Sequence, residues 1–96
     1  MDFKVLIADS AIADLKDIVE FVAQHNPYAA LRLGEKLVDR ASSLRAMPQR
    51  FPFHDRGRGI RKMVVRPFRM FYTCDEASRI VNILHFWHGA PRPPDF

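Results

Sequence analysis

The side chains that could do chemistry stand in the second half of the chain. His88 ends an apolar segment, directly after Trp87, and an imidazole can take or give a proton near neutral pH. Arg61 and Arg69 alternate with apolar residues, and a guanidinium fork fits a phosphate or a carboxylate. Arginines beside Tyr72 favour an RNA ligand, because phosphates bind arginine and bases stack on aromatic rings. The alternative is that these arginines reach solvent or bind a carboxylate of the protein itself.

Charge divides the chain in the same way. Residues 1–39 hold four basic and seven acidic side chains, a net charge of −3, whereas residues 40–96 hold eleven basic and four acidic ones, a net charge of +7. Ten of those eleven basic residues are arginines, which suits a polyanion or an acidic protein partner. A basic surface that meets only solvent is the alternative that charge alone leaves open.

A helical hairpin is expected in the first half. The segment FKVLI predicts a short strand at residues 3–7. Apolar residues at helical spacing then predict one helix that ends near residue 25 and a second from residue 27 to about residue 46. Asp9 or Ser10 could cap the first helix with a side-chain oxygen. The connection between the helices is so short that they should pack antiparallel.

The second half is expected to form an irregular loop and then a sheet. Residues 47–59 contain two prolines and two glycines, which argues against a regular element. Branched and aromatic residues then predict a meander of three antiparallel strands, at residues 60–65, 68–74 and 80–87. The expected fold is therefore α+β, in the order βααβββ, with the hairpin packed on one face of a small, mainly antiparallel curved sheet. Strand alternation puts His85 and His88 on opposite faces, so only one of them can face the side that the helices leave open.

Size and composition exclude several classes of protein. Ninety-six residues make one domain, and its proline-rich residues 89–96 are expected to be extended or flexible. Cys74 is the only cysteine, so neither an internal disulfide nor a multi-cysteine zinc site can form, and a reducing cytoplasm is the expected setting. No apolar run approaches the roughly 20 residues that span a membrane, and the first ten residues do not read as a signal peptide. We expect no metal, no cofactor and no membrane partner.

Three segments together resemble one protein family. They are ADLKDIVEFVAQHNPYAA at residues 13–30, SLRAMPQRFP at residues 43–52 and IRKMVVRPFRMFYTCDEASRIVNILHFWHGA at residues 60–90. Their order, with an arginine strand followed by an apolar strand that ends in histidine, resembles the RelE/ParE toxins of bacterial type II toxin–antitoxin systems. The resemblance covers nearly the whole chain. It implies a toxin held inactive by a cognate antitoxin, and we expect an acidic or amphipathic antitoxin segment to wrap over the basic sheet or the hairpin groove.

The resemblance implies one of two targets. RelE-like members cleave mRNA, usually on the ribosome and without a metal, whereas ParE-like members act on DNA gyrase. Cleavage is our first hypothesis, and gyrase binding without catalysis is the alternative. A third hypothesis is a degenerate member of the family that only binds its antitoxin. For cleavage, the family's typical strand arginine and C-terminal histidine match Arg69 and His88.

Other residues complete these expectations. Arg61 could stabilise phosphate charge beside Arg69, and His54 or Asp55 could supply a second proton-transfer group. The residues expected to bind nucleic acid or another target are Arg56, Arg58, Lys62, Tyr72 and Arg92.

Overall fold

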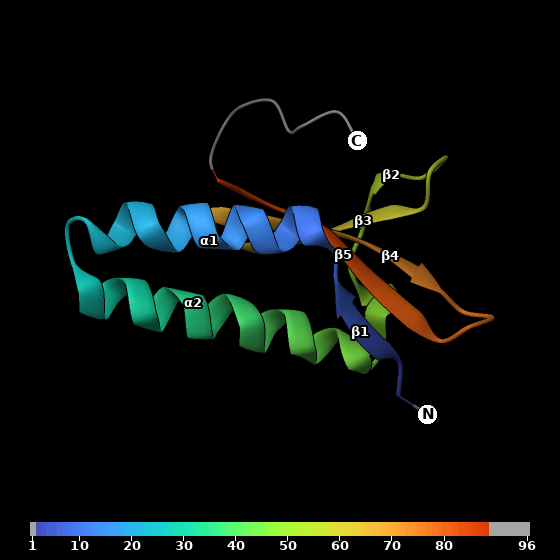
Figure 1. The fold of residues 1–96 in the computed structure, drawn as a ribbon. Helices are drawn as coiled ribbons and strands as arrows, with labels where there is room; N and C mark the ends of the chain where they lie inside the picture. Colours follow the sequence, from blue (N-terminus) through green and yellow to red (C-terminus); the bar gives the residue numbers. More distant parts are fainter. Residues whose placement is uncertain (1, 89–96) are drawn as a thin grey trace.

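Two helices pack on a five-stranded sheet in the computed structural model, which describes residues 2–88 (Figure 1). The helices lie side by side, and part of the sheet passes behind the first helix in this view (Figure 1). The sheet has the order β1-β5-β4-β3-β2, in which β1 is parallel to β5 and the other neighbours are antiparallel. The elements are β1 (Lys4–Ile7), α1 (Asp9–Ala23), α2 (Pro27–Ser42), β2 (Phe53–Asp55), β3 (Ile60–Val65), β4 (Phe68–Asp75) and β5 (Ile80–His88). The predicted α+β fold is confirmed, with one strand more than expected.

Local chemistry explains where the second helix begins and ends. Asn26 accepts a hydrogen bond from the backbone N–H of Ala29 at 3.1 Å, and Pro27 occupies the first helical position. The helix ends at Ser42 rather than at the expected residue 46, because the chain tightens into a 3₁₀ turn, Ser43–Arg45.

The prediction that residues 47–59 form an irregular loop was wrong in part. These residues contain a 3₁₀ turn, Pro48–Arg50, and the edge strand β2. This strand is only three residues long, and its pairing with β3 shifts register between Phe53 and Asp55. So short and irregular a strand shows no alternation that sequence could reveal.

The core lies between the helices and one face of the sheet. On the helical side, Leu37 and Leu44 have no exposed surface, and on the sheet Met70, Tyr72 and Ile83 have none either. Tyr72 also donates a hydrogen bond of 2.6 Å from its hydroxyl to the carbonyl oxygen of Pro48. This bond ties the segment before β2 to the centre of the sheet, so Tyr72 holds the fold together and does not offer a surface to a target.

Because the hydroxyl of Tyr72 is buried, we expect the protein to lose stability at high pH. Burial raises the pKa of Tyr72 to about 12, whereas an unfolded tyrosine has a pKa of about 10. The hydroxyl of Tyr72 therefore stays protonated to higher pH in the native state than in the unfolded state. The contribution of protonated Tyr72 to the free energy of unfolding is complete below about pH 10 and falls between about pH 10 and 12. In urea unfolding, Tyr72→Phe should lower the free energy of unfolding at pH 7 by about 1 kcal/mol, through loss of the hydrogen bond, and flatten the alkaline fall. Tyr28→Phe, at an exposed residue, is the matched control. An unchanged alkaline fall in Tyr72→Phe would contradict this role.

Candidate functional site

The two predicted catalytic residues lie on neighbouring strands but on opposite faces of the sheet. In the pairing of β4 with β5, Phe68 stands opposite His88 and Arg69 stands opposite Trp87. Because neighbouring residues of a strand point to opposite faces, His88 shares the helix-facing side with Phe68 and Arg69 shares the other side with Trp87. The structure does not bring Arg69 and His88 together.

A β-bulge in β5 causes this separation. Tyr72 pairs with Ile83, but the preceding residue Phe71 pairs with His85. Leu84 is therefore an extra residue, and the side chains beyond it change face.

Burial along β5 follows the bulge. Val81 and Ile83 are buried two residues apart, and the next buried residue, Phe86, comes three residues later. With unbroken alternation from Ile83, Phe86 and His88 would share the face of Arg69. The bulge instead returns Phe86 to the core and puts His88 beside the helices.

Helix α1 holds the bulge in place. Ser10 donates a hydrogen bond of 2.6 Å from its hydroxyl to the carbonyl oxygen of Leu84. Asp14, one helical turn later, accepts a hydrogen bond of 3.1 Å from the backbone N–H of Phe86, and its carboxylate lies 2.7 Å from Nδ1 of His85. These bonds satisfy backbone groups that an irregular strand leaves without a ladder partner. The hydroxyl of Ser10 therefore stabilises the bulge. The prediction that Asp9 or Ser10 caps α1 is wrong, since Ala8 is the N-cap and has no side-chain cap bond.

His88 stands in an apolar groove, which we call the His88 groove. Its ring packs on that of Phe68, with the ring centroids 4.8 Å apart. The groove has a volume of about 610 Å³ and contains one carboxylate, that of Asp17, and no arginine. Its lining residues are Asp17, Ile18, Phe21, Val22, Ala29, Leu33, Pro67, Phe68 and His88. These surroundings suit an apolar ligand or a protein segment, and not a phosphate.

Arg61 is engaged by the protein itself. Its Nη1 donates hydrogen bonds to the carbonyl oxygens of Gln49 at 3.0 Å and Phe51 at 2.7 Å, and its guanidinium lies 3.9 Å from the ring centre of Phe53. In the β3–β4 pairing it stands opposite Tyr72, on the face of the sheet that lies away from Arg69. Arg61 thus positions the segment between α2 and β3, and the three residues predicted to be catalytic do not form one site.

The residues predicted to bind a target are dispersed. Tyr72 is buried, as described above, and Arg92 lies outside the described residues, as does the predicted tail 89–96. Arg56 and Arg58 are exposed on the turn between β2 and β3, and Lys62 lies half-buried on β3.

The two loop residues considered for proton transfer have other contacts. The ring of His54 packs on that of Phe71, with centroids 4.7 Å apart. Asp55 accepts a hydrogen bond of 3.2 Å from the backbone N–H of Arg58 and so shapes the turn.

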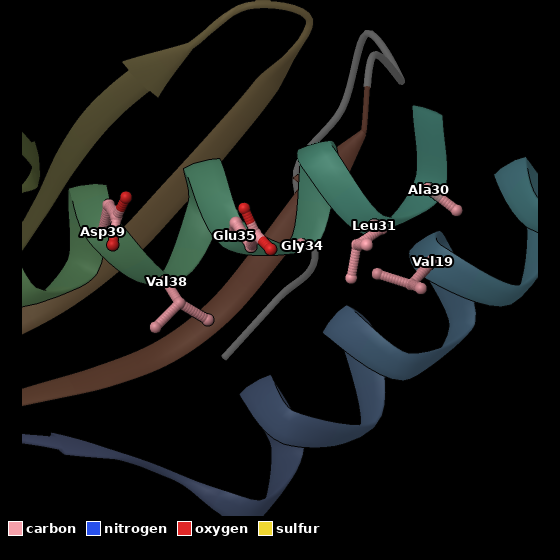
Figure 2. A pocket seen from close by; sticks show the side chains of 7 residues that line it. All are labelled: Val19, Ala30, Leu31, Gly34, Glu35, Val38 and Asp39. Atoms are coloured by element: carbon pink, nitrogen blue, oxygen red, sulfur yellow. The ribbon is translucent and has the colours of Figure 1, made fainter. Parts of the chain in front are cut away.

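A second apolar groove opens on the other side of the helical hairpin, and we call it the outer groove. Figure 2 shows Val19 of α1 and Leu31 of α2 on its facing sides, with Val38 farther along α2. Its volume is about 480 Å³, and Glu35 and Asp39 give it an acidic margin. The sequence analysis expected a groove on the hairpin as one of two antitoxin sites but did not identify the residues that line it. The signal that could have revealed the groove is apolar residues on α2 at positions outside the buried stripe.

Within residues 2–88, no three His, Cys, Asp or Glu side chains gather where they could hold a metal ion. None of the helices in that range is long and apolar enough to cross a membrane.

Comparisons with known proteins point to one family. The family model described as the ParE toxin of the type II toxin–antitoxin system parDE matches residues 5–93. A solved structure of the chromosomal ParDE system from P. aeruginosa aligns with a TM-score of 0.78 and 19% sequence identity over 90% of this chain and 95% of that one. The toxin–antitoxin complex RelBE2 from Mycobacterium tuberculosis aligns with a TM-score of 0.69 and 22% identity over 93% of this chain and 100% of that one. No curated protein matches the chain.

The contact of Asp14 with the bulge predicts energetic coupling between α1 and β5. Asp14→Ala removes the acceptor of the Phe86 N–H and should lower the free energy of unfolding by about 1–3 kcal/mol. His85→Ala should also destabilise, and the double variant should lose less than the sum, with a coupling energy of roughly 0.5 kcal/mol or more in chemical denaturation. Asp17→Ala, at an exposed residue of the same type, should change stability by less than about 0.5 kcal/mol. Strict additivity of the Asp14 and His85 variants would contradict the coupling.

Proposed function

Because the chain belongs to the ParE toxin family of type II toxin–antitoxin systems, we propose that it stops growth by binding DNA gyrase, without cleaving RNA. The observation that carries this proposal is the separation of Arg69 from His88 across the sheet. Cleavage of RNA needs a proton-transfer group and a cation for the phosphate charge at one site, with reacting atoms about 3 Å apart. A toxin that only binds has no such requirement.

His85 adds support, because its imidazole is engaged within the fold. Nδ1 of His85 lies 2.7 Å from the Asp14 carboxylate. His88 itself meets the ring of Phe68 in an apolar groove. The described lining of this groove contains no arginine or lysine that could stabilise the charge of a phosphate, so the groove favours protein binding over phosphate chemistry.

Metal-independent cleavage of mRNA on the ribosome was the first hypothesis from sequence. It rested on Arg69 and His88 acting together, with Arg61 as a further cation. Arg61 donates to two backbone carbonyls, and His88 and Arg69 face opposite sides. The geometry therefore gives this hypothesis less support than it gives gyrase binding.

The helical hairpin supplies an exposed apolar surface of the kind that protein partners cover. Large side chains there keep between 39% and 76% of their surface exposed, namely Ile12, Phe21, Tyr28, Leu31 and Val38. The cognate antitoxin that the family implies is expected to cover part of this surface. At the outer groove an acidic segment would meet Glu35 and Asp39, so an amphipathic segment with basic flanks fits that groove better than an acidic one.

A gyrase assay with purified toxin tests the proposed target. Added to DNA gyrase and relaxed plasmid, the toxin should inhibit supercoiling at concentrations comparable to that of the enzyme. Incubated with ribosomes translating an mRNA, the same preparation should leave the mRNA intact, because Arg69 and His88 lie on opposite faces of the sheet.

The variant His88→Ala separates the two hypotheses in those assays. Cleavage of mRNA by the native toxin that His88→Ala abolishes, together with unimpaired supercoiling, would overturn the proposal. Circular dichroism establishes that the variant retains the fold.

The outer groove predicts a strong effect of one substitution on antitoxin binding. Leu31→Asp puts a charge on the exposed wall of the groove, and should weaken the complex with the cognate antitoxin at least tenfold in isothermal titration calorimetry, or about 1.4 kcal/mol. Lys36→Asp, on the exposed surface of the same helix but outside the groove, is the control and should change the affinity much less. Equal effects of the two variants would mean that the antitoxin does not use this groove.

A further inference from the structure

A basic hollow lies at the edge of the sheet where the 3₁₀ turn Pro48–Arg50 leads into β2. Its volume is about 620 Å³, and it shares no lining residue with the His88 groove or the outer groove. The lining contains three arginines and no carboxylate. The lining residues are Gln49, Arg50, Phe51, Pro52, Phe53, His54, Arg56 and Arg61.

The arginines of the basic hollow are held against its aromatic rings. The guanidinium of Arg50 lies 4.7 Å from the ring centre of Phe51. Those of Arg56 and Arg61 lie 4.7 Å and 3.9 Å from the ring centre of Phe53. A guanidinium fixed on a ring loses little further freedom when it binds an anion, because its position is already set.

Two of these arginines also brace the backbone of the hollow. Arg50 donates to the carbonyl oxygens of Ala46 and Met47, and Arg61 donates to those of Gln49 and Phe51. Arg50 and Arg61 therefore give the site a fixed wall of positive charge.

The turn beside the hollow adds exposed donors to this fixed wall. Arg56 and Arg58 are exposed, and within residues 2–88 neither forms an ion pair with a carboxylate. Two acids lie close by, and both are bound: Asp55 accepts the backbone N–H of Arg58, and Glu76 accepts a hydrogen bond of 2.9 Å from the amide of Gln49. Arg56 and Arg58 therefore retain guanidinium donors for an external anion.

We propose that the basic hollow and its turn bind the phosphate backbone of duplex DNA. Proteins that recognise single strands rely on aromatic rings on which bases stack. In this hollow, guanidiniums lie over Phe51 and Phe53, so the site offers charge rather than a stacking surface. An acidic protein segment would need an apolar anchor at the centre of its contact, and the same guanidiniums occupy the rings that could provide one. Backbone phosphates need only the charge and the donors.

This inference goes beyond the proposed function and does not depend on it. Binding to DNA by the toxin alone is measured with no gyrase present, so either claim can fail while the other stands. If both hold, the toxin contacts the enzyme and its DNA through separate surfaces.

Fluorescence anisotropy with a labelled duplex of arbitrary sequence tests the proposal. The full chain should bind the duplex at low salt, and the binding constant should fall steeply with salt. The double variant Arg56→Ala, Arg58→Ala should bind at least tenfold more weakly, with a salt slope shallower by about two, since each lost phosphate contact removes about 0.9.

A matched control removes the same charge elsewhere. Arg32→Ala, Arg40→Ala deletes two exposed arginines of α2 and should change the affinity less than twofold. Thermal unfolding of both double variants establishes that they are folded.

Three results would overturn the proposal. The first is equal loss of duplex binding in the two double variants, which would make the effect one of net charge. The second is tighter binding of single-stranded RNA of equal length that depends on Arg56 and Arg58. The third is no duplex binding by the native chain together with Arg56- and Arg58-dependent binding of a poly-glutamate peptide.

Discussion

One extra residue in β5 determines which way the functional side chains point. Leu84 interrupts the pairing with β4, and every side chain beyond it changes face. The irregular backbone is stable because Ser10 and Asp14 of α1 bind its carbonyl and N–H groups. The contact between the first helix and the last strand therefore fixes the position of His88, although the two elements are far apart in sequence.

The bulge at Leu84 determines which functional side chains lie on each face of the sheet. His88 joins an apolar groove against the helices, Arg69 stays on the far face, and Arg61 braces the segment before β2. Arg69 and His88 are thus kept apart, while the hairpin exposes apolar surface on both of its sides. Exposed apolar surface of this kind suits the binding of protein partners. It agrees with a toxin that an antitoxin protein neutralises and that, as we propose, acts on a protein target. The arginines of the basic half lie on both faces of the sheet rather than on one, as Arg61 and Arg69 show.

Periodicity in the sequence predicted the hairpin, the strands β3, β4 and β5, and the fold class, because those patterns run long enough to be read. It missed β2, whose three residues are too few to alternate. It placed His85 and His88 on opposite faces correctly but could not say which face either one takes, since the letters LHFWH are the same with or without a bulge. The bulge depends on Asp14, about seventy residues earlier, and no local pattern records that contact. The prediction that Arg61 is a catalytic cation failed for a similar reason. The carbonyl groups that Arg61 binds belong to Gln49 and Phe51, in the segment that was predicted to be an irregular loop.

The separation of His88 from Arg69 is the central claim, and nuclear Overhauser spectroscopy on the isotope-labelled full chain tests it most directly. The ring protons of His88 should show cross-peaks to the ring protons of Phe68. Cross-peaks from the His88 ring to the side chain of Arg69, with none to Phe68, would contradict the bulged register and restore a shared catalytic site.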